Sequence, residues 1–171
     1  MKQESNNQML SPHFSLKEMT ESQTARKQGI ANIPTPDAVE NLRRLCANTL
    51  EPLREELGLP VVITSGFRTK ALNDILAHAS ERSQHMQGQA ADFYVGEGSL
   101  KPETPRQRLI RAFRLIITSE QIDYDQLILY PSFIHVSYVS RERNRRTILL
   151  GMRNGKLGYG KCSVQNALKI Q

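Results

Sequence analysis

The sequence has little cysteine, no tryptophan and no long apolar run. Its two cysteines, Cys46 and Cys162, are too few for a disulfide framework, so we expect two free thiols. No window approaches the roughly 18 to 20 apolar residues of a membrane-spanning helix, which excludes a membrane span. The opening residues, MKQESNNQMLSPHF, are polar and lack the apolar stretch of a secretory signal, so we expect synthesis in the cytoplasm.

The composition is that of a globular protein with excess positive charge. A length of 171 residues suits one domain, and 39% hydrophobic and 23% charged residues lie near the globular average. The net charge of +6 favours polyanionic partners, either nucleic acid or an anionic cell wall. Aromatic residues make up only 6% of the chain and offer few stacking platforms, which argues against nucleic acid. The arginines at 141, 143, 145 and 146 form either a solvated loop or part of such a contact.

Hydrophobic periodicity predicts an α+β domain. The expected helices cover residues 15–27, 36–57, 70–78 and 104–117, and the expected strands 61–64, 89–95, 125–130, 133–139 and 147–152. Because the last three strands follow one another, we expect a small antiparallel sheet with helices packed on one side. Around it we expect a flexible lead-in over 1–12, a domain over 13–152 and a C-terminal tail over 153–171.

Two polar residues interrupt apolar strands. Asp92 lies between Ala90-Ala91 and Phe93-Tyr94, and His135 lies among Phe133, Ile134 and Val136. A buried carboxylate or imidazole needs a partner, so we expect the two strands to bring these side chains to a shared partner. His85, seven positions before Asp92, supplies a third candidate. Zinc, which commonly takes three protein ligands at catalytic sites, is one solution, and a His–Asp hydrogen bond inside the core is the other.

Three motifs carry a family resemblance. SGFRT at 65–69, SQHMQGQAADF at 83–93 and FIHVSY at 133–138 resemble the superfamily of zinc D-Ala-D-Ala carboxypeptidases and L-alanyl-D-glutamate peptidases, whose fold the Hedgehog signalling domain shares. The resemblance implies one zinc ion per chain, bound by His85, Asp92 and His135. It also implies that Arg68 pairs with a substrate carboxylate and that Ser83 lines the same cleft.

The sequence departs from that family at the general base that peptide hydrolysis needs. Many relatives place an acidic residue a few positions before the last histidine, whereas Tyr130 and Ser132 stand in this region here. We expect one of these two near the metal and leave the base unassigned. Asp125, further upstream, is interpreted as structural.

The resemblance implies a zinc-dependent peptidase that cleaves peptidoglycan stem peptides, as a carboxypeptidase or an endopeptidase. The alternative is a non-catalytic zinc-containing module of the same fold that binds a wall fragment. Without a secretory signal, we expect a phage or prophage lysin that reaches the wall through a separate pore, or a virion-associated enzyme. We expect the protein to be monomeric, with a peptidoglycan peptide as its partner.

Overall fold

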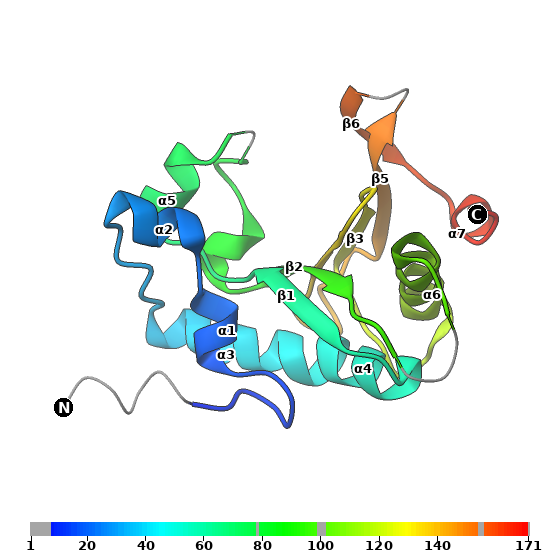
Figure 1. The fold of residues 1–171 in the computed structure, drawn as a ribbon, viewed down its shortest axis with the longest axis horizontal. Coiled ribbons are helices and arrows are strands. Elements are labelled where there is room, and N and C mark those ends of the chain that lie inside the picture. The colour runs from blue at the N-terminus through cyan, green and yellow to red at the C-terminus, as the bar shows by residue number, and fades with distance from the viewer. Residues whose placement is uncertain (1–7, 78, 99–101, 154–155, 171) are drawn as a thin grey trace.

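The structure is a computed structural model that describes residues 8–77, 79–98, 102–153 and 156–170. His78, interpreted from the sequence as capping a helix end, lies outside the described residues, as does the start of the predicted lead-in. The described chain folds into one mixed sheet with helices against it (Figure 1). This confirms the predicted α+β class.

The sheet has six strands in the order β1-β2-β4-β3-β5-β6. They are β1 (Val61–Ser65), β2 (Ala90–Val95), β3 (Gln126–Leu129), β4 (Ile134–Ser137), β5 (Thr147–Arg153) and β6 (Lys156–Lys161). Neighbouring strands run antiparallel except β3 and β5, which are parallel. The prediction of a small, purely antiparallel sheet was therefore wrong in size and in strand direction.

The parallel pair has a simple cause. The hairpin strand β4 has both edges occupied, by β2 and by β3, so the next strand can add only at the outer edge of β1 or of β3, and it adds at β3. The chain leaves β4 beside the start of β3, where Ser137 pairs with Gln126, and begins β5 at the same end, where Thr147 pairs with Gln126. The Thr147 N–H donates to the Asp125 carbonyl at 2.9 Å, and this bond sets the start of β5.

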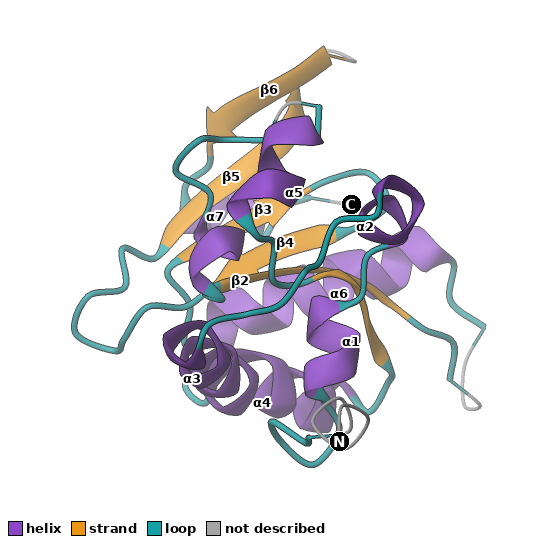
Figure 2. Ribbon diagram, turned by 90° about the vertical axis from the view of Figure 1, so that its left-hand side faces the viewer, coloured by secondary structure: helices purple, strands orange, loops and turns teal. Residues whose placement is uncertain are grey.

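The helices begin largely where capping residues predict. They are α1 (Leu16–Thr20), α2 (Gln23–Gln28), α3 (Pro36–Leu45), the π-helical turn η2 (Cys46–Leu50), α4 (Glu51–Leu57), α5 (Lys70–Ile75), the 3₁₀ turn η3 (Gln84–Gln87), α6 (Pro105–Thr118) and α7 (Val164–Ala167). Thr35 and Thr104 cap α3 and α6 ahead of a proline, as expected. The expected helix over 15–27 is two helices, because Ser22 caps a second start. Figure 2 shows α3, α4 and α6 on one face of the sheet and α5 on the other.

Strand alternation separates the core from the site. Phe93, Ile134 and Leu127 are buried and belong to the hydrophobic core. Because neighbouring residues in a strand point to opposite faces, Asp92 and His135 point away from that core. The helix-covered face of the sheet therefore stabilises the fold, and the other face carries the polar side chains.

Both ends of the described chain join this core. Leu10 and Ala167 are buried in it, and residues 156–170 carry β6 and α7. The division into lead-in, domain and tail stays a prediction. Within the described ranges, no helix has the length and apolar character needed to cross a bilayer.

Candidate metal centre

Strand register brings Asp92 and His135 together. Asp92 of β2 pairs with His135 of β4, and His135 pairs in turn with Ile128 of β3. Residues directly opposite each other in a sheet point to the same face, so these side chains form one row across it. Ser65, at the end of β1, is paired with Asp92 and extends the row.

His85 reaches this row from outside the sheet, on the 3₁₀ turn η3. Its Nδ1 lies 2.6 Å from the Gly66 carbonyl oxygen, and its own carbonyl accepts from the Arg68 N–H at 3.1 Å. Gly88 ends the turn at φ +69°, where a Cβ would lie 2.3 Å from the Ala38 carbonyl oxygen, so only glycine fits. The turn that carries His85 is thus fixed at both ends.

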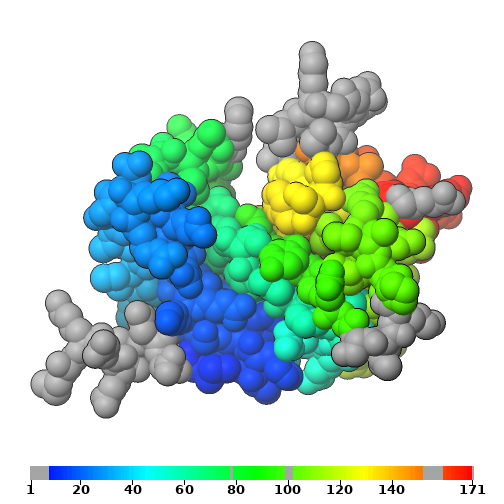
Figure 3. Space-filling view, viewed as in Figure 1, coloured from blue at the N-terminus to red at the C-terminus, as the bar shows by residue number. Residues whose placement is uncertain are grey.

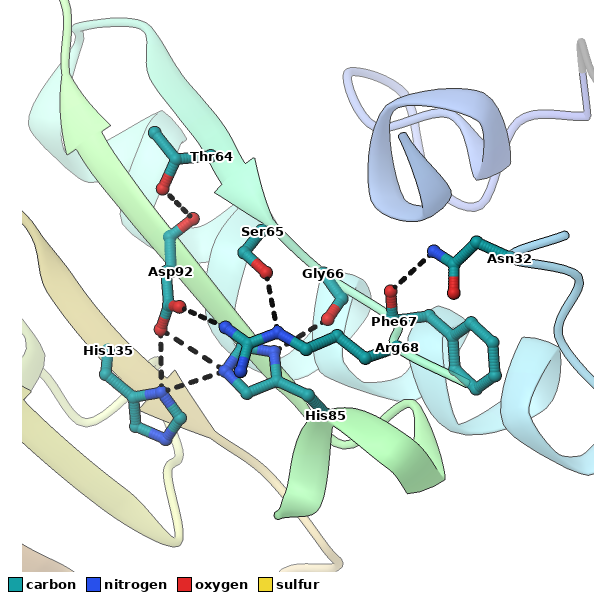
Figure 4. A network of polar contacts seen from close by, with 9 residues as sticks. All are labelled: Asn32, Thr64, Ser65, Gly66, Phe67, Arg68, His85, Asp92 and His135. Atoms are coloured by element: carbon teal, nitrogen blue, oxygen red, sulfur yellow. Dashed lines mark hydrogen bonds and ion pairs between the residues drawn. The ribbon is translucent and has the colours of Figure 1, made fainter. Parts of the chain in front are cut away.

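The three side chains converge on one point (Figure 4). His85 Nε2 lies 3.2 Å from His135 Nδ1 and 3.3 Å from Asp92 Oδ1, and His135 Nδ1 lies 2.7 Å from the same carboxylate oxygen. All three ligand atoms fall within 4.8 Å of one another. The ligands of a tetrahedral zinc ion, bound at about 2.0 to 2.1 Å, stand about 3.3 Å apart, which matches both contacts of His85 Nε2. His135 Nδ1 and Asp92 Oδ1 are closer, at hydrogen-bond distance, and would move apart slightly to bind the ion.

The hydrogen bonding of His85 directs the lone pair of its Nε2 to the point where the three side chains meet. Because a carbonyl only accepts, Nδ1 of His85 must carry the proton that it shares with Gly66. In the neutral ring Nε2 then presents a lone pair to Asp92 Oδ1, which also only accepts. These two acceptors lie 3.3 Å apart, and either a cation or the proton of His135 Nδ1, which lies 3.2 Å from the nitrogen and 2.7 Å from the oxygen, bridges them. The donor set of two imidazoles and one carboxylate is one that zinc takes.

The protonation states suit metal binding. Burial lowers the pKa of His85, although Asp92 acts against this shift, and the neutral ring is the form that binds metal. Burial alone would raise the pKa of Asp92, but the neighbouring His85 and His135 outweigh it and hold the pKa below its ordinary value. Asp92 is therefore a carboxylate.

Arg68 lies beside the three side chains and binds one of them directly. Its Nη2 donates to Asp92 Oδ2 at 2.9 Å, and its Nε donates to the Ser65 hydroxyl at 3.0 Å. The two bonds hold the guanidinium beside the ligand row and leave Asp92 Oδ1 turned toward the histidines (Figure 4). The sequence motif pointed to a substrate carboxylate at Arg68 but gave no sign of this ion pair.

A cavity of about 910 Å³ lies over the row. His85, Asp92, His135, Arg68 and Ser83 all line it, and so does Tyr130, whereas Ser132 does not. The cavity lies between the segment that holds α5 and the hairpin that joins β3 to β4. Figure 3 shows the surface hollowed between these parts, green and yellow respectively.

The carboxylates that line the cavity, among the described residues, are Asp92 and Asp125. Asp125 is buried and accepts hydrogen bonds from the backbone and guanidinium of Arg145, from Gln84 Nε2 at 2.9 Å and from the Ser137 hydroxyl. Burial would raise its pKa, but Arg145 outweighs this and lowers the pKa. Asp125 is thus committed to structure, and the general base stays unassigned.

The Arg145–Asp125–Gln84 network was missed from the sequence. The arginines at 141–146 were interpreted as a solvated loop or a polyanion contact, yet Arg143 and Arg145 line the cavity. The available signal was Asp125, an acid directly before an apolar strand, which required a cationic partner from elsewhere in the chain.

An α+β domain with two histidines and an aspartate converging at the floor of an open cavity has the arrangement of a mononuclear metallohydrolase site. The chain belongs to the Peptidase M15 family, whose model matches residues 12–137. Peptidases of this family are zinc-dependent, and the candidate metal site provides ligands that suit that ion. No curated protein matches the sequence.

Proposed function

We propose that the protein is a zinc-dependent peptidase that cleaves peptidoglycan stem peptides, with one zinc ion held by His85, Asp92 and His135. The observation that carries this proposal is the convergence of the three ligand atoms within 4.8 Å at a cavity that a peptide can enter. Bound zinc polarises a carbonyl and makes a bound water more acidic. The family supports a peptide substrate, and the excess positive charge favours an anionic wall.

Arg68 and Ser83 are proposed to bind the substrate. A guanidinium has five N–H groups, and two of those of Arg68 are taken by Ser65 and Asp92. Three remain for a substrate carboxylate, which a planar guanidinium binds in a fork. Ser83 lines the cavity two residues before His85 and offers a hydroxyl to the peptide backbone.

The second candidate function is a zinc-containing module that binds wall peptides without cleaving them. One observation favours it: Asp92 and Asp125, the carboxylates found among the described cavity residues, are both engaged by partners. Proton transfer by a general base typically contributes about 10²–10⁴ to the rate. A site without one would bind its ligand but turn it over slowly.

One experiment tests both functions. Purified peptidoglycan is incubated with the zinc-loaded protein, with a chelator-treated sample and with His135→Ala, and the released peptides are identified by mass spectrometry. The peptidase predicts new peptide ends that zinc restores after chelation and that His135→Ala does not produce. Zinc-dependent binding to the wall without any new peptide end would reject the peptidase in favour of the binding module. The site of action proposed here is the cell wall, for a phage-derived or virion-associated enzyme.

A further inference from the structure

Two loops that line the cavity are joined to each other, and each carries an arginine that lines it. The loop that follows α5 leads into Gln84, and the loop that follows β4 leads into Arg145. Arg145 Nη2 donates to Gln84 Oε1 at 3.3 Å, and this bond joins the two loops. Arg82 and Arg143 each stand two residues before a member of that pair, and both line the cavity. Arg82 and Arg143 therefore line the same cavity from two loops that this bond joins.

The two arginines leave unbalanced positive charge in the cavity. Arg68 is paired with Asp92 and Arg145 with Asp125, so these two arginines are neutralised locally. Arg82 and Arg143 have no ion pair with any acid in the described part of the chain, and both are exposed. An open cavity with two unpaired guanidinium groups attracts an anionic ligand group.

The loop that carries Arg143 is held in a defined shape. The Val139 N–H donates to the Asn144 side-chain oxygen at 2.9 Å, and the Arg145 N–H donates to Asp125 Oδ1 at 2.8 Å. Arg146 adopts φ +51°, a left-handed conformation that is uncommon outside glycine and persists where the surroundings enforce it. Arg143 is therefore presented from a pre-organised turn, which reduces the entropy lost on binding.

We propose that Arg82 and Arg143 form a carboxylate-binding subsite that selects acidic peptides, those that carry a free carboxylate in addition to the group bound at Arg68. The proposal rests on the proposed function and specifies its substrate class. A guanidinium fork matches a carboxylate in a way that a neutral carboxamide does not. Stem peptides with a free D-glutamate α-carboxylate are then preferred over those in which this group is amidated.

The test uses two probes that differ only in that charge. They are the tripeptide L-alanyl-γ-D-glutamyl-L-lysine and the same peptide with the D-glutamate α-carboxylate replaced by a carboxamide. Binding to the zinc-loaded protein is measured by calorimetry, and chromatography then checks whether the probe is intact. Where a probe is cleaved, kcat/KM takes the place of the affinity.

The parent protein is expected to prefer the acid over the amide by about tenfold or more. Arg82→Ala and Arg143→Ala should each weaken acid binding by about three- to tenfold, leave amide binding within twofold and together abolish the preference. Arg141→Ala is the matched control, because Arg141 lies on the same loop and does not line the cavity. That variant should keep the preference.

Three outcomes would overturn the subsite. They are equal affinity of the parent for acid and amide, equal loss of both probes in the two arginine variants, and an Arg141→Ala variant that behaves like Arg143→Ala. A single-stranded oligonucleotide that displaces the acid probe would also overturn the subsite if the affinity for the oligonucleotide falls equally in Arg82→Ala, Arg143→Ala and Arg141→Ala. That result would indicate general polyanion binding. A failure of the peptidase function is distinguishable: a retained acid preference supports the subsite whether or not the probes are cut, and peptidoglycan that yields no new peptide ends rejects cleavage separately.

Discussion

Replacement of Arg68 by alanine should weaken zinc binding, even though Arg68 provides no metal ligand in the proposed site. Arg68 Nη2 holds Asp92 Oδ2 at 2.9 Å, while Oδ1 faces the two histidines. Without the guanidinium, the carboxylate is free to rotate and is stabilised less well as an anion. Loss of a partner that orients a metal ligand typically costs 10- to 100-fold in metal affinity, or about 1.4 to 2.7 kcal/mol.

The same substitution should also reduce stability. The side chains of Arg68 and Asp92 are 15% and 12% exposed, so the ion pair is largely shielded from water. Removal of one partner of a fully buried pair costs about 3–5 kcal/mol, and the residual exposure together with the neighbouring histidines reduces this to about 1–3 kcal/mol. In a domain of this size the metal-free protein should lose roughly 2–12 °C in Tm.

Competition with a fluorescent chelator measures the zinc affinity, and circular dichroism measures Tm in the same preparations. Arg82→Ala is the control, because it removes a cavity-lining arginine that has no ion pair with Asp92. Arg68→Lys should be intermediate, since it keeps the charge but not the separate bonds to Ser65 and Asp92. Zinc affinity within twofold of the parent in a folded Arg68→Ala protein would refute the reasoning, and so would an equal loss in Arg82→Ala.

Three further predictions follow from the described contacts. Metal analysis should find about one equivalent of zinc in the parent protein and little in His135→Ala; full retention by that variant would reject the ligand set. Burial works against ionisation of Asp125, but Arg145 lowers its pKa, so its stabilising effect is complete above about pH 4 and is lost as the pH falls further. The Tm difference between the parent and Asp125→Asn should accordingly shrink below about pH 4. A difference that grew there would contradict a lowered pKa of Asp125. Burial raises the pKa of Cys46 to about 12, so a thiol reagent should modify Cys162 first and Cys46 only after unfolding, as peptide mapping would show.

The sequence predicted those parts of the fold that depend on local patterns. Apolar periodicity together with capping at Thr35 and Thr104 located the long helices, because caps and periodicity act within a few residues. Strand direction is not local, and for this reason the parallel pairing of β3 with β5 was missed. It depends on which sheet edge is free after β4 has paired, and on the contacts of Asp125 that hold the returning chain.

The candidate site shows the same limit. A polar residue within an apolar strand is visible in the sequence, so Asp92 and His135 could be singled out and their meeting proposed. Their register, the tautomer of His85 and the ion pair of Arg68 depend on contacts between segments far apart in the chain. Gln84 and Arg145, 61 residues apart, form their hydrogen bond only in the folded protein.

Tyr130 offers the most direct test of the missing general base. It lines the cavity five residues before His135, in the region where the family resemblance led us to expect an acid. Its ring stacks on Phe133 with centroids 4.2 Å apart and packs against Gly151, at which a Cβ would lie 2.3 Å from the ring. A shorter side chain therefore fits at this position without a clash.

If the protein is a peptidase limited by the lack of a base, Tyr130→Glu should raise kcat on a stem peptide. A fully effective base would contribute about 10²–10⁴, and a carboxylate placed without further optimisation should recover about tenfold of this. Ser132→Glu adds the same charge two residues away, at an exposed position that does not line the cavity, and should leave kcat unchanged. Zinc content is measured in both variants, because an added carboxylate near the metal could otherwise act through zinc affinity.

Unchanged kcat in a folded, zinc-loaded Tyr130→Glu protein would mean that a missing carboxylate at this position does not limit the rate. An equal rise in kcat in both variants would instead assign the effect to added negative charge in general, because Tyr130 lines the cavity and Ser132 does not.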